Sequence, residues 1–204
     1  MLDYIRSTDE GEIKVRRLVL RRFQAEDMDD LYAIRNHSSV RKYMMDTTEL
    51  DYQKHYTWAS QHLLSAERDV LLFIARIDNE ACGFSLIRDA IGSQAEIGFI
   101  FRRANDLHQL LYIPESVVAF GYFLFAHLDM RELYSYVVNG HERALRLNLA
   151  FGGEVVPSDR DRMTRIRITR KNCMESDAYT KIFGRIADVI KVDDTLAPMN
   201  AGRR

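Results

Sequence analysis

The pattern of apolar and polar positions along the chain predicts alternating strands and helices. Stretches that are apolar throughout, or at every second position, predict strands at residues 18–23, 70–76, 81–88, 94–101, 132–138 and 163–169. Apolar residues three and four positions apart predict helices at residues 25–37, 51–66, 114–128, 141–151 and 174–190. The first dozen residues and those after 192 lack such a pattern, so we expect an ordered core at about residues 14–192.

Three local features refine this pattern. In strand 94–101 the odd positions are apolar and face away from Glu96, Gly98 and Ile100. The helix at 114–128 is apolar on nearly all sides, which predicts deep burial, and Pro114 fits its first position. Asp78-Asn79 marks the turn of a hairpin, with an expected connection of three or four residues.

The order of these elements is β-α-α-β-β-β-α-β-α-β-α. Three consecutive strands followed by alternating helices and strands indicate a mixed sheet flanked by helices, in the α/β (α+β) class. With 204 residues, no internal repeat and no linker rich in proline, glycine or serine, the whole chain is expected to form one domain.

Composition and charge narrow the functional classes. The chain is 47% hydrophobic and 29% charged with a net charge of −1, which excludes a disordered protein and gives no overall attraction to nucleic acid or an anionic membrane. The longest apolar stretch, residues 117–128, is too short to span a bilayer, and no secretory signal opens the chain. Cys82 and Cys173 lie far apart without metal-ligand spacing, so we expect no metal and a cytoplasmic protein.

Four segments, in this order and spacing, carry a resemblance to a known family. They are LVLRRFQAEDMDDLYAIRNHSSVRKYM, the hairpin FIARIDNEACGFSLIR, the strand AEIGFIF and the helix with its following turn at residues 142–152. Together they resemble the GNAT acetyltransferases over roughly residues 18–190. The opening segment is similar to the branch that acetylates ribosomal-protein N-termini and to relatives that acetylate nucleotide-linked aminosugars.

The resemblance implies an activity and a site. A member of this family transfers an acetyl or other acyl group from acyl-CoA to a primary amine of a small molecule, an aminosugar or a peptide N-terminus. The fourth and fifth strands of its mostly antiparallel sheet splay apart, and the pantetheine arm of acetyl-CoA lies in the gap. The resemblance assigns backbone contacts with that arm to Ile100, Phe101 and Arg102. It assigns the acceptor pocket to Arg35, Asn36 and Tyr43.

The chain departs from the family pattern at two places. Residues 102–113 contain no glycine, although a glycine loop normally holds the pyrophosphate through backbone N–H groups. Two alternatives follow: Arg102, Arg103 and His108 bind the phosphates as side chains, or the bulky residues at 110–112 fill the phosphate site.

On the last family helix, Asn148 stands where many members carry a tyrosine that protonates the leaving thiolate. His141 replaces the asparagine that usually opens this helix, and Asn139 lies two residues earlier. Asn139 and Asn148 therefore join the candidate cofactor-binding residues.

Glu96 is the candidate catalytic base, because acyl transfer requires a neutral amine and this carboxylate stands among apolar neighbours on a central strand. In some family members a glutamate at this place serves as the base. The alternative is a glutamate that pairs with an arginine or caps a loop.

Three functional hypotheses remain open at this point. The leading one is an acyl-CoA-dependent N-acyltransferase. The second is an acyltransferase with an unusual donor, such as an acyl carrier protein or a longer acyl chain. The third is a GNAT-like domain without catalysis that serves as a binding or regulatory module. The sequence leaves open the acceptor and the oligomeric state, a homodimer included.

Overall fold

The computed structural model describes residues 10–65, 68–102 and 107–196, without the side chains of residues 107–110. Nine described strands form one sheet in the order β7-β8-β6-β5-β4-β3-β2-β1-β9. The strands are β1 (Glu12–Val15), β2 (Leu18–Arg22), β3 (Val70–Ile77), β4 (Glu80–Ile91), β5 (Gln94–Phe101), β6 (Glu132–Val138), β7 (Gly153–Val156), β8 (Met163–Thr169) and β9 (Ile190–Val192). All neighbouring strands pair antiparallel except β5 and β6, which are parallel.

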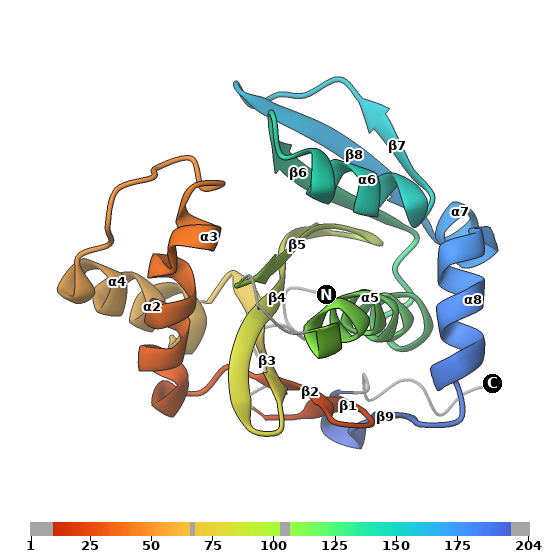
Figure 1. Cartoon of the computed structure of the whole chain (residues 1–204), viewed down its shortest axis with the longest axis horizontal. Coiled ribbons are helices and arrows are strands. Elements are labelled where there is room, and N and C mark those ends of the chain that lie inside the picture. Colours follow the sequence, from red (N-terminus) through yellow and green to blue (C-terminus); the bar gives the residue numbers. More distant parts are fainter. Residues whose placement is uncertain (1–9, 66–67, 103–106, 197–204) are drawn as a thin grey trace.

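Helices cover both faces of this sheet (Figure 1). The α-helices are α2 (Met28–Asn36), α3 (Ser38–Arg41), α4 (Tyr52–Ala59), α5 (Leu107–Tyr122), α6 (Glu142–Ala150), α7 (Arg170–Glu175) and α8 (Asp177–Ile186). The π-helical turns η2 (Ser60–Leu64) and η3 (Phe123–His127) extend α4 and α5, and the 3-10 turns are η1 (Ala25–Asp27) and η4 (Asp194–Leu196). The expected mixed, mostly antiparallel sheet flanked by helices is therefore confirmed.

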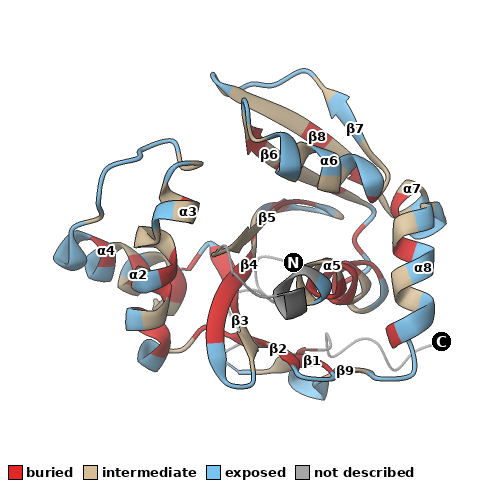
Figure 2. Cartoon of the chain, in the orientation of Figure 1, coloured by how far each residue is buried: buried red, intermediate tan, exposed pale blue. Residues whose placement is uncertain are grey.

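Two hydrophobic cores lie on opposite faces of the sheet. Alternate residues of β3 supply each core: Leu71 and Phe73 pack with α5 in one, and Leu72 and Ile74 pack with α2 and η2 in the other. Buried residues accordingly concentrate on β3, β4 and the inner side of α5 (Figure 2). The alternation follows from the two-residue period of a strand, and it explains why β3 is apolar at almost every position.

The neighbouring strands β5 and β6 separate halfway along their length. Parallel pairing between β5 and β6 covers Gln94–Ile97 and Glu132–Ser135 and then stops, although both strands continue. Beyond this point β6, β7, β8 and α6 turn away from β5 as a separate part of the molecule (Figure 1). The expected splay of the family's fourth and fifth strands, here β5 and β6, is confirmed.

The long central helix begins earlier than expected. Pro114 was predicted to open it after an irregular loop at 102–113, but α5 already begins at Leu107 and Pro114 lies inside it. Leu107, Leu110 and Leu111 do recur at helical spacing, so the helical pattern precedes the proline. The prediction gave the proline too much weight, since its missing N–H costs one helical hydrogen bond but does not exclude a helix around it.

Other boundaries also differ from expectation. Strands β1, β7 and β9 were not predicted, because three or four residues are too few to establish a period and these strands form only against their neighbours. Helix 174–190 is instead the pair α7 and α8, followed by β9. The hairpin connection is two residues, Asp78 and Asn79, both at positive φ. Two residues in this conformation match the twist of paired strands.

Candidate active site

A cavity of about 560 Å³ passes through the gap between β5 and β6. On one face of the sheet its wall comes from α2, α4, β3 and β4, through residues such as Leu31, Trp58 and Leu86. On the other face its wall comes from α5, β6 and α6. Because β5 contributes Glu96 through Phe101 to both sides, a ligand in the gap can meet a second ligand that enters from the α2–α4 face.

Backbone groups of β5 point into this gap. The N–H of Arg102 donates to the carbonyl of Cys82 at 3.0 Å, so the pair formed by these residues is hydrogen-bonded. In an antiparallel ladder alternate residues share a direction, and in the register of β4 and β5 the groups of Ile100 therefore also face β4. The backbone groups of Phe99 and Phe101 face the gap, where no β6 partner pairs with them. Ile100 and Arg102 were expected to offer their backbone here, but these groups face β4.

Glu96 lies at one end of the cavity between two arginines. Its side chain is buried, with the residue 8% exposed, and Arg88 contacts it through Nε at 2.8 Å from Oε1 and through Nη2. Arg160 donates from Nη1 to Oε1 at 3.0 Å and from Nη2 to Oε2 at 2.6 Å. Both carboxylate oxygens are therefore engaged. This pairing with arginine is the alternative to a base that the sequence also predicts for Glu96.

Arg160 was not among the residues that the sequence suggested. It comes from the connection between β7 and β8, its guanidinium carbon lies 3.8 Å from the centre of the Tyr136 ring, and it lines the cavity. The Tyr136 hydroxyl donates to Asp159 at 2.6 Å. Burial and then this hydrogen bond raise the pKa of Tyr136. No local signal in the sequence brings residue 160 to residue 96, because their contact depends on how β8 returns beside β6.

Arg35 lines the cavity on the α2–α4 side, as expected for an acceptor-pocket residue. Its guanidinium carbon lies 4.6 Å from the centre of the Trp58 ring, and Nη1 lies 3.3 Å from Nδ1 of His55. Burial and then the charge of Arg35 lower the pKa of His55 to about 4, so this imidazole is neutral at pH 7. Among the described residues, no carboxylate pairs with Arg35, and its buried Nε has no hydrogen-bond partner.

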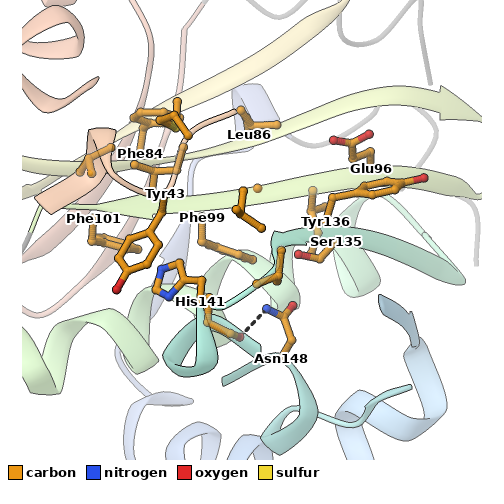
Figure 3. A pocket seen from close by; sticks show the side chains of 18 of the residues that line it. Tyr43, Phe84, Leu86, Glu96, Phe99, Phe101, Ser135, Tyr136, His141 and Asn148 are labelled. Carbon is orange, nitrogen blue, oxygen red and sulfur yellow. Dashed lines mark hydrogen bonds between the residues drawn. The ribbon is translucent and has the colours of Figure 1, made fainter. Parts of the chain in front are cut away.

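Tyr43, which follows α3, and His141, which precedes α6, both line the cavity and contact each other across it. The rings stack with centroids 3.5 Å apart and an interplanar angle of 11° (Figure 3). Burial, then Lys42 and Arg143, lower the pKa of His141. Asn36 is not a cavity residue: its amide exchanges two hydrogen bonds with the backbone of Leu50 and so holds the loop after α3.

The helix α6 side of the gap offers an amide and a hydroxyl. Asn148 lines the cavity, and its Nδ2 donates to the carbonyl of Ala144 at 2.9 Å (Figure 3). Ser135, in the last β6 position that pairs with β5, also lines the cavity and has no hydrogen-bond partner among the described residues. It was missed, although a serine at an inward position between Leu133 and Val137 was a visible signal. Asn139 is exposed outside the cavity and accepts from Thr164 at 3.0 Å.

The three expected phosphate ligands are only partly described. Arg102 forms an ion pair with Glu80, on the hairpin side of the sheet. Arg103 lies outside the described residues, and of His108 only the helical backbone is described. The side-chain model for phosphate binding therefore stays a prediction.

No described helix is long and apolar enough to cross a membrane. Within the described residues, no group of three or more histidine, cysteine, aspartate or glutamate side chains could hold a metal ion. Both cysteines are free and buried, and burial raises the pKa of Cys82 to about 11.

Solved structures share this fold. A RimJ from Mycobacterium smegmatis in complex with CoA-disulfide has a TM-score of 0.67 at 14% identity, covering 91% of this chain and 98% of that one. A GCN5-related N-acetyltransferase from Brucella melitensis has a TM-score of 0.69 at 15% identity, covering 96% and 91%. A spermidine N-acetyltransferase from Vibrio cholerae in complex with CoA and spermine has a TM-score of 0.64 at 13% identity, covering 78% and 99%.

The TM-scores establish a common fold, but at such low sequence identities they leave the substrate open. A comparison with curated protein sequences gives no match. The model of the acetyltransferase (GNAT) domain, in contrast, matches residues 17–154, which is most of the chain and includes both sides of the gap. The matched region carries the strands that splay, the cavity between them and the helices that cover it. This chain therefore belongs to the GNAT acetyltransferase family.

Proposed function

We propose that this protein is an N-acyltransferase that takes an acetyl or other acyl group from acyl-CoA and transfers it to a primary amine. The observation that carries the proposal is the continuous cavity, which joins the gap between β5 and β6 to a chamber under α2–α4. A thioester in the gap and an amine in the chamber would meet beside β5. Bringing two reactants together in this way is a large part of the catalysis of a bimolecular step.

The donor half of the cavity suits a pantetheine arm. The backbone groups of Phe99 and Phe101 supply donors and acceptors for its amides, as a paired strand would. Apolar side chains such as Val117 and Leu124 enclose the arm and exclude water. The N-terminal end of α5, at Leu107, offers helical N–H groups and the positive end of a helix dipole to the pyrophosphate.

The chemistry requires a neutral amine and a proton for the sulfur. The amine nitrogen attacks the thioester carbonyl and the C–S bond breaks. The nitrogen loses one proton and the departing thiolate takes one up, so the products are an amide and the free thiol of coenzyme A. Glu96 is the proposed proton acceptor, because it is the buried carboxylate in the wall of the cavity. Glu96 can accept a proton only when Arg88 or Arg160 releases one of its oxygens. The side chains of both arginines are partly exposed to solvent at this end of the cavity, so each has room to adopt another rotamer.

The surroundings also favour the neutral amine directly. Nearby guanidinium groups repel an ammonium ion and lower its pKa. Arg88 and Arg160 therefore raise the fraction of bound amine that is already neutral and does not have to transfer a proton to Glu96. For the departing sulfur, Ser135 offers a hydroxyl without another partner among the described residues, at the point where β5 and β6 separate. We assign to Ser135 the hydrogen bond that the tyrosine hydroxyl makes in many relatives.

The proposal is tested by binding and turnover together. Acetyl-CoA should bind, and a panel of primary amines should release free coenzyme A, measured as thiol. Ser135→Ala should lower turnover by roughly tenfold to a hundredfold with donor binding retained, since one hydrogen bond to the transition state is lost. Ser93→Ala, in the turn between β4 and β5 outside the cavity, is the matched control. Binding of acetyl-CoA without turnover of any amine would instead support a binding module, and absence of binding would contradict the donor assignment.

A further inference from the structure

The charged residues around the acceptor chamber are predominantly basic. Among the described residues that line the cavity, four are arginines and two are carboxylates. Glu96 is shared by Arg88 and Arg160, and Asp46 accepts two hydrogen bonds from Thr48. The remaining arginines, Arg35 and Arg41, therefore face the chamber without a strong anionic partner: Arg41 has only Glu49, at 3.5 Å, and Arg35 has no carboxylate among the described residues.

Arg35 is the most informative of these groups. Its guanidinium is partly buried, lies over the ring of Trp58 and is hydrogen-bonded to the neutral ring of His55. Neither partner carries a negative charge, and burial lowers the pKa of Arg35. A cation withdrawn from water without a counter-ion is costly unless something else compensates it. The contact with the Trp58 ring and the hydrogen bond from Nη1 to His55 hold the guanidinium in place at the cavity wall, where it can donate a charge-assisted hydrogen bond to a carboxylate.

The walls around Arg35 are apolar. Leu31, Trp58, Leu72, Phe84 and Leu86 line the same chamber. An acceptor that fills it must therefore present a hydrophobic body as well as an anionic group. A polyamine fits poorly, because its several positive charges would face arginines instead of carboxylates.

Building on the proposed function, we propose that the acceptor is a small amine that carries both a carboxylate and an apolar side chain, with Arg35 binding the carboxylate. The apolar side chain packs between α2, α4 and β4. The amine then lies toward β5, where the thioester carbonyl is presented. An α-amino acid with an aromatic or aliphatic side chain has this combination of groups.

The test compares matched acceptors at saturating acetyl-CoA. L-phenylalanine, L-phenylalaninamide, phenethylamine and spermidine are assayed by release of coenzyme A. We expect kcat/KM for phenylalanine to exceed that for the amide by roughly tenfold to a hundredfold, the range of a charge-assisted hydrogen bond. The amide has the less basic amine, so the comparison is biased against the proposal. Equal rates for acid and amide, or a preference for spermidine, would overturn it.

A binding arm makes the test independent of turnover. In the presence of coenzyme A, N-acetyl-L-phenylalanine should bind at least tenfold more tightly than its amide, by calorimetry. Arg35→Gln should remove this difference and Arg35→Lys should keep part of it. Arg17→Gln, at an exposed arginine paired with Asp78 outside the cavity, should leave it unchanged. If Arg35→Gln does not fold, the acid-to-amide ratio in the unmodified protein decides. Equal binding of the acid and the amide to the unmodified protein would overturn the proposal.

The outcomes separate the two proposals. If coenzyme A binds and amides or polyamines are acetylated as well as acids, the N-acyltransferase stands and only the anionic acceptor fails. If N-acetyl-L-phenylalanine shows Arg35-dependent binding without any turnover, the anion site stands and the catalytic proposal fails. If neither coenzyme A nor the anionic product binds, both fail.

Discussion

At the residue scale, Glu96 combines two roles that are usually assigned to different groups. Its carboxylate anchors Arg88 and Arg160, and it is also the buried acid in the wall of the cavity. Both oxygens of this carboxylate are hydrogen-bonded to guanidinium groups, so one of them must be released before it can accept a proton. Whether it accepts a proton or only positions the arginines is therefore a kinetic question.

Glu96→Gln distinguishes these roles. We expect turnover at neutral pH to fall by about two to four orders of magnitude with folding intact. For a base the loss should shrink as pH rises, because more of the amine is then already neutral; for a positioning group it should stay constant. The measurement is kcat/KM from pH 6 to 9. Glu12→Gln, at a carboxylate paired with Lys14 on β1 outside the cavity, is the control. Near-full activity of Glu96→Gln at neutral pH would remove Glu96 from the mechanism.

His55 should make stability depend on pH. Its pKa in the folded protein is about 4, against an ordinary value of 6.5, and the residue is only 3% exposed. Because the folded value is lowered, the stability it contributes is complete above pH 6.5 and is lost as pH falls toward 4. The loss should reach about 2 kcal/mol at pH 5. Urea unfolding at pH 7.5 and 5 measures it, and His55→Gln should show a smaller pH dependence. Equal dependence in both proteins would contradict the assignment.

At the scale of elements, the gap between β5 and β6 is where the structure departs from a regular sheet. A strand that loses its neighbour leaves backbone groups unpaired, and such groups are normally satisfied by another partner. Here the unpaired groups of Phe99 and Phe101 face the cavity. The backbone groups of Gly98 and Ile100, by contrast, face β4, which holds β5 in place while its other edge stays open.

Amide hydrogen exchange measures which N–H groups of β5 are paired with β4 and which face the gap. In the free protein the N–H groups of Phe99 and Phe101 should exchange fast, whereas those of Gly98 and Ile100 should be protected by β4. Acetyl-CoA should slow exchange at Phe99 and Phe101 by at least about tenfold and leave the other two protected, since an unpaired N–H gains a partner only on binding. NMR exchange rates with and without ligand give the comparison. Unchanged exchange at Phe101 in the complex would place the donor elsewhere.

The junction between α6 and β7 depends on a glycine. Gly152 has a φ of +79°, and a Cβ there would lie 2.3 Å from the carbonyl oxygen of Asn172. Gly140 has a similar φ of +88°, but a Cβ there meets nothing within 4 Å. The two positions share the backbone conformation and differ in the contact, so they form a matched pair.

Gly152→Ala should therefore destabilise more than Gly140→Ala. Backbone strain alone should cost Gly140→Ala about 1–2 kcal/mol, and the added clash should bring Gly152→Ala to about 3 kcal/mol or more. Urea unfolding of both variants measures the difference. Equal losses would show that α7 moves away from Gly152 at little cost.

At the scale of the whole molecule, the sheet consists of two parts joined along a short seam. Strands β5 and β6 pair over four residues each, and β7, β8 and α6 belong to the part beyond that seam. A ligand in the gap contacts both parts and so binds the folded protein in preference to the unfolded chain. Its effect on stability should follow its concentration.

Acetyl-CoA at a hundred times its dissociation constant should add about 2.7 kcal/mol of stability. For a protein of this size that corresponds to a rise in Tm of roughly 5–10 °C. The measurement is thermal unfolding with acetyl-CoA and with ADP, which shares the nucleotide diphosphate but lacks pantetheine. The difference between the two rises in Tm gives the contribution of the pantetheine arm in the gap. An equal rise with ADP would place the binding energy outside the gap, and no rise with acetyl-CoA would contradict the donor site.

The length of an element decided how well the sequence predicted it. Strands 94–101, 132–138 and 163–169 were predicted with the bounds they have, because seven or eight alternating residues establish a period by themselves. The odd–even split of β5 was also predicted correctly, with Ile97 in one core and Ile100 against the other. Short strands such as β7 carry no period and were missed.

By itself, the sequence determined the order of the long elements, the family and the position of Glu96 and Arg35 on elements that border the cavity, because each of these follows from local periodicity or a contiguous motif. Only the tertiary structure decided what those residues touch. Arg160 reaches Glu96 across 64 positions, and Tyr43 contacts His141, which lies in the second half of the chain. Such contacts depend on the crossover that brings β8 beside β6 and on the separation of β5 from β6. A local pattern fixes which way a side chain faces, whereas the packing of distant elements fixes its partner and hence its chemistry.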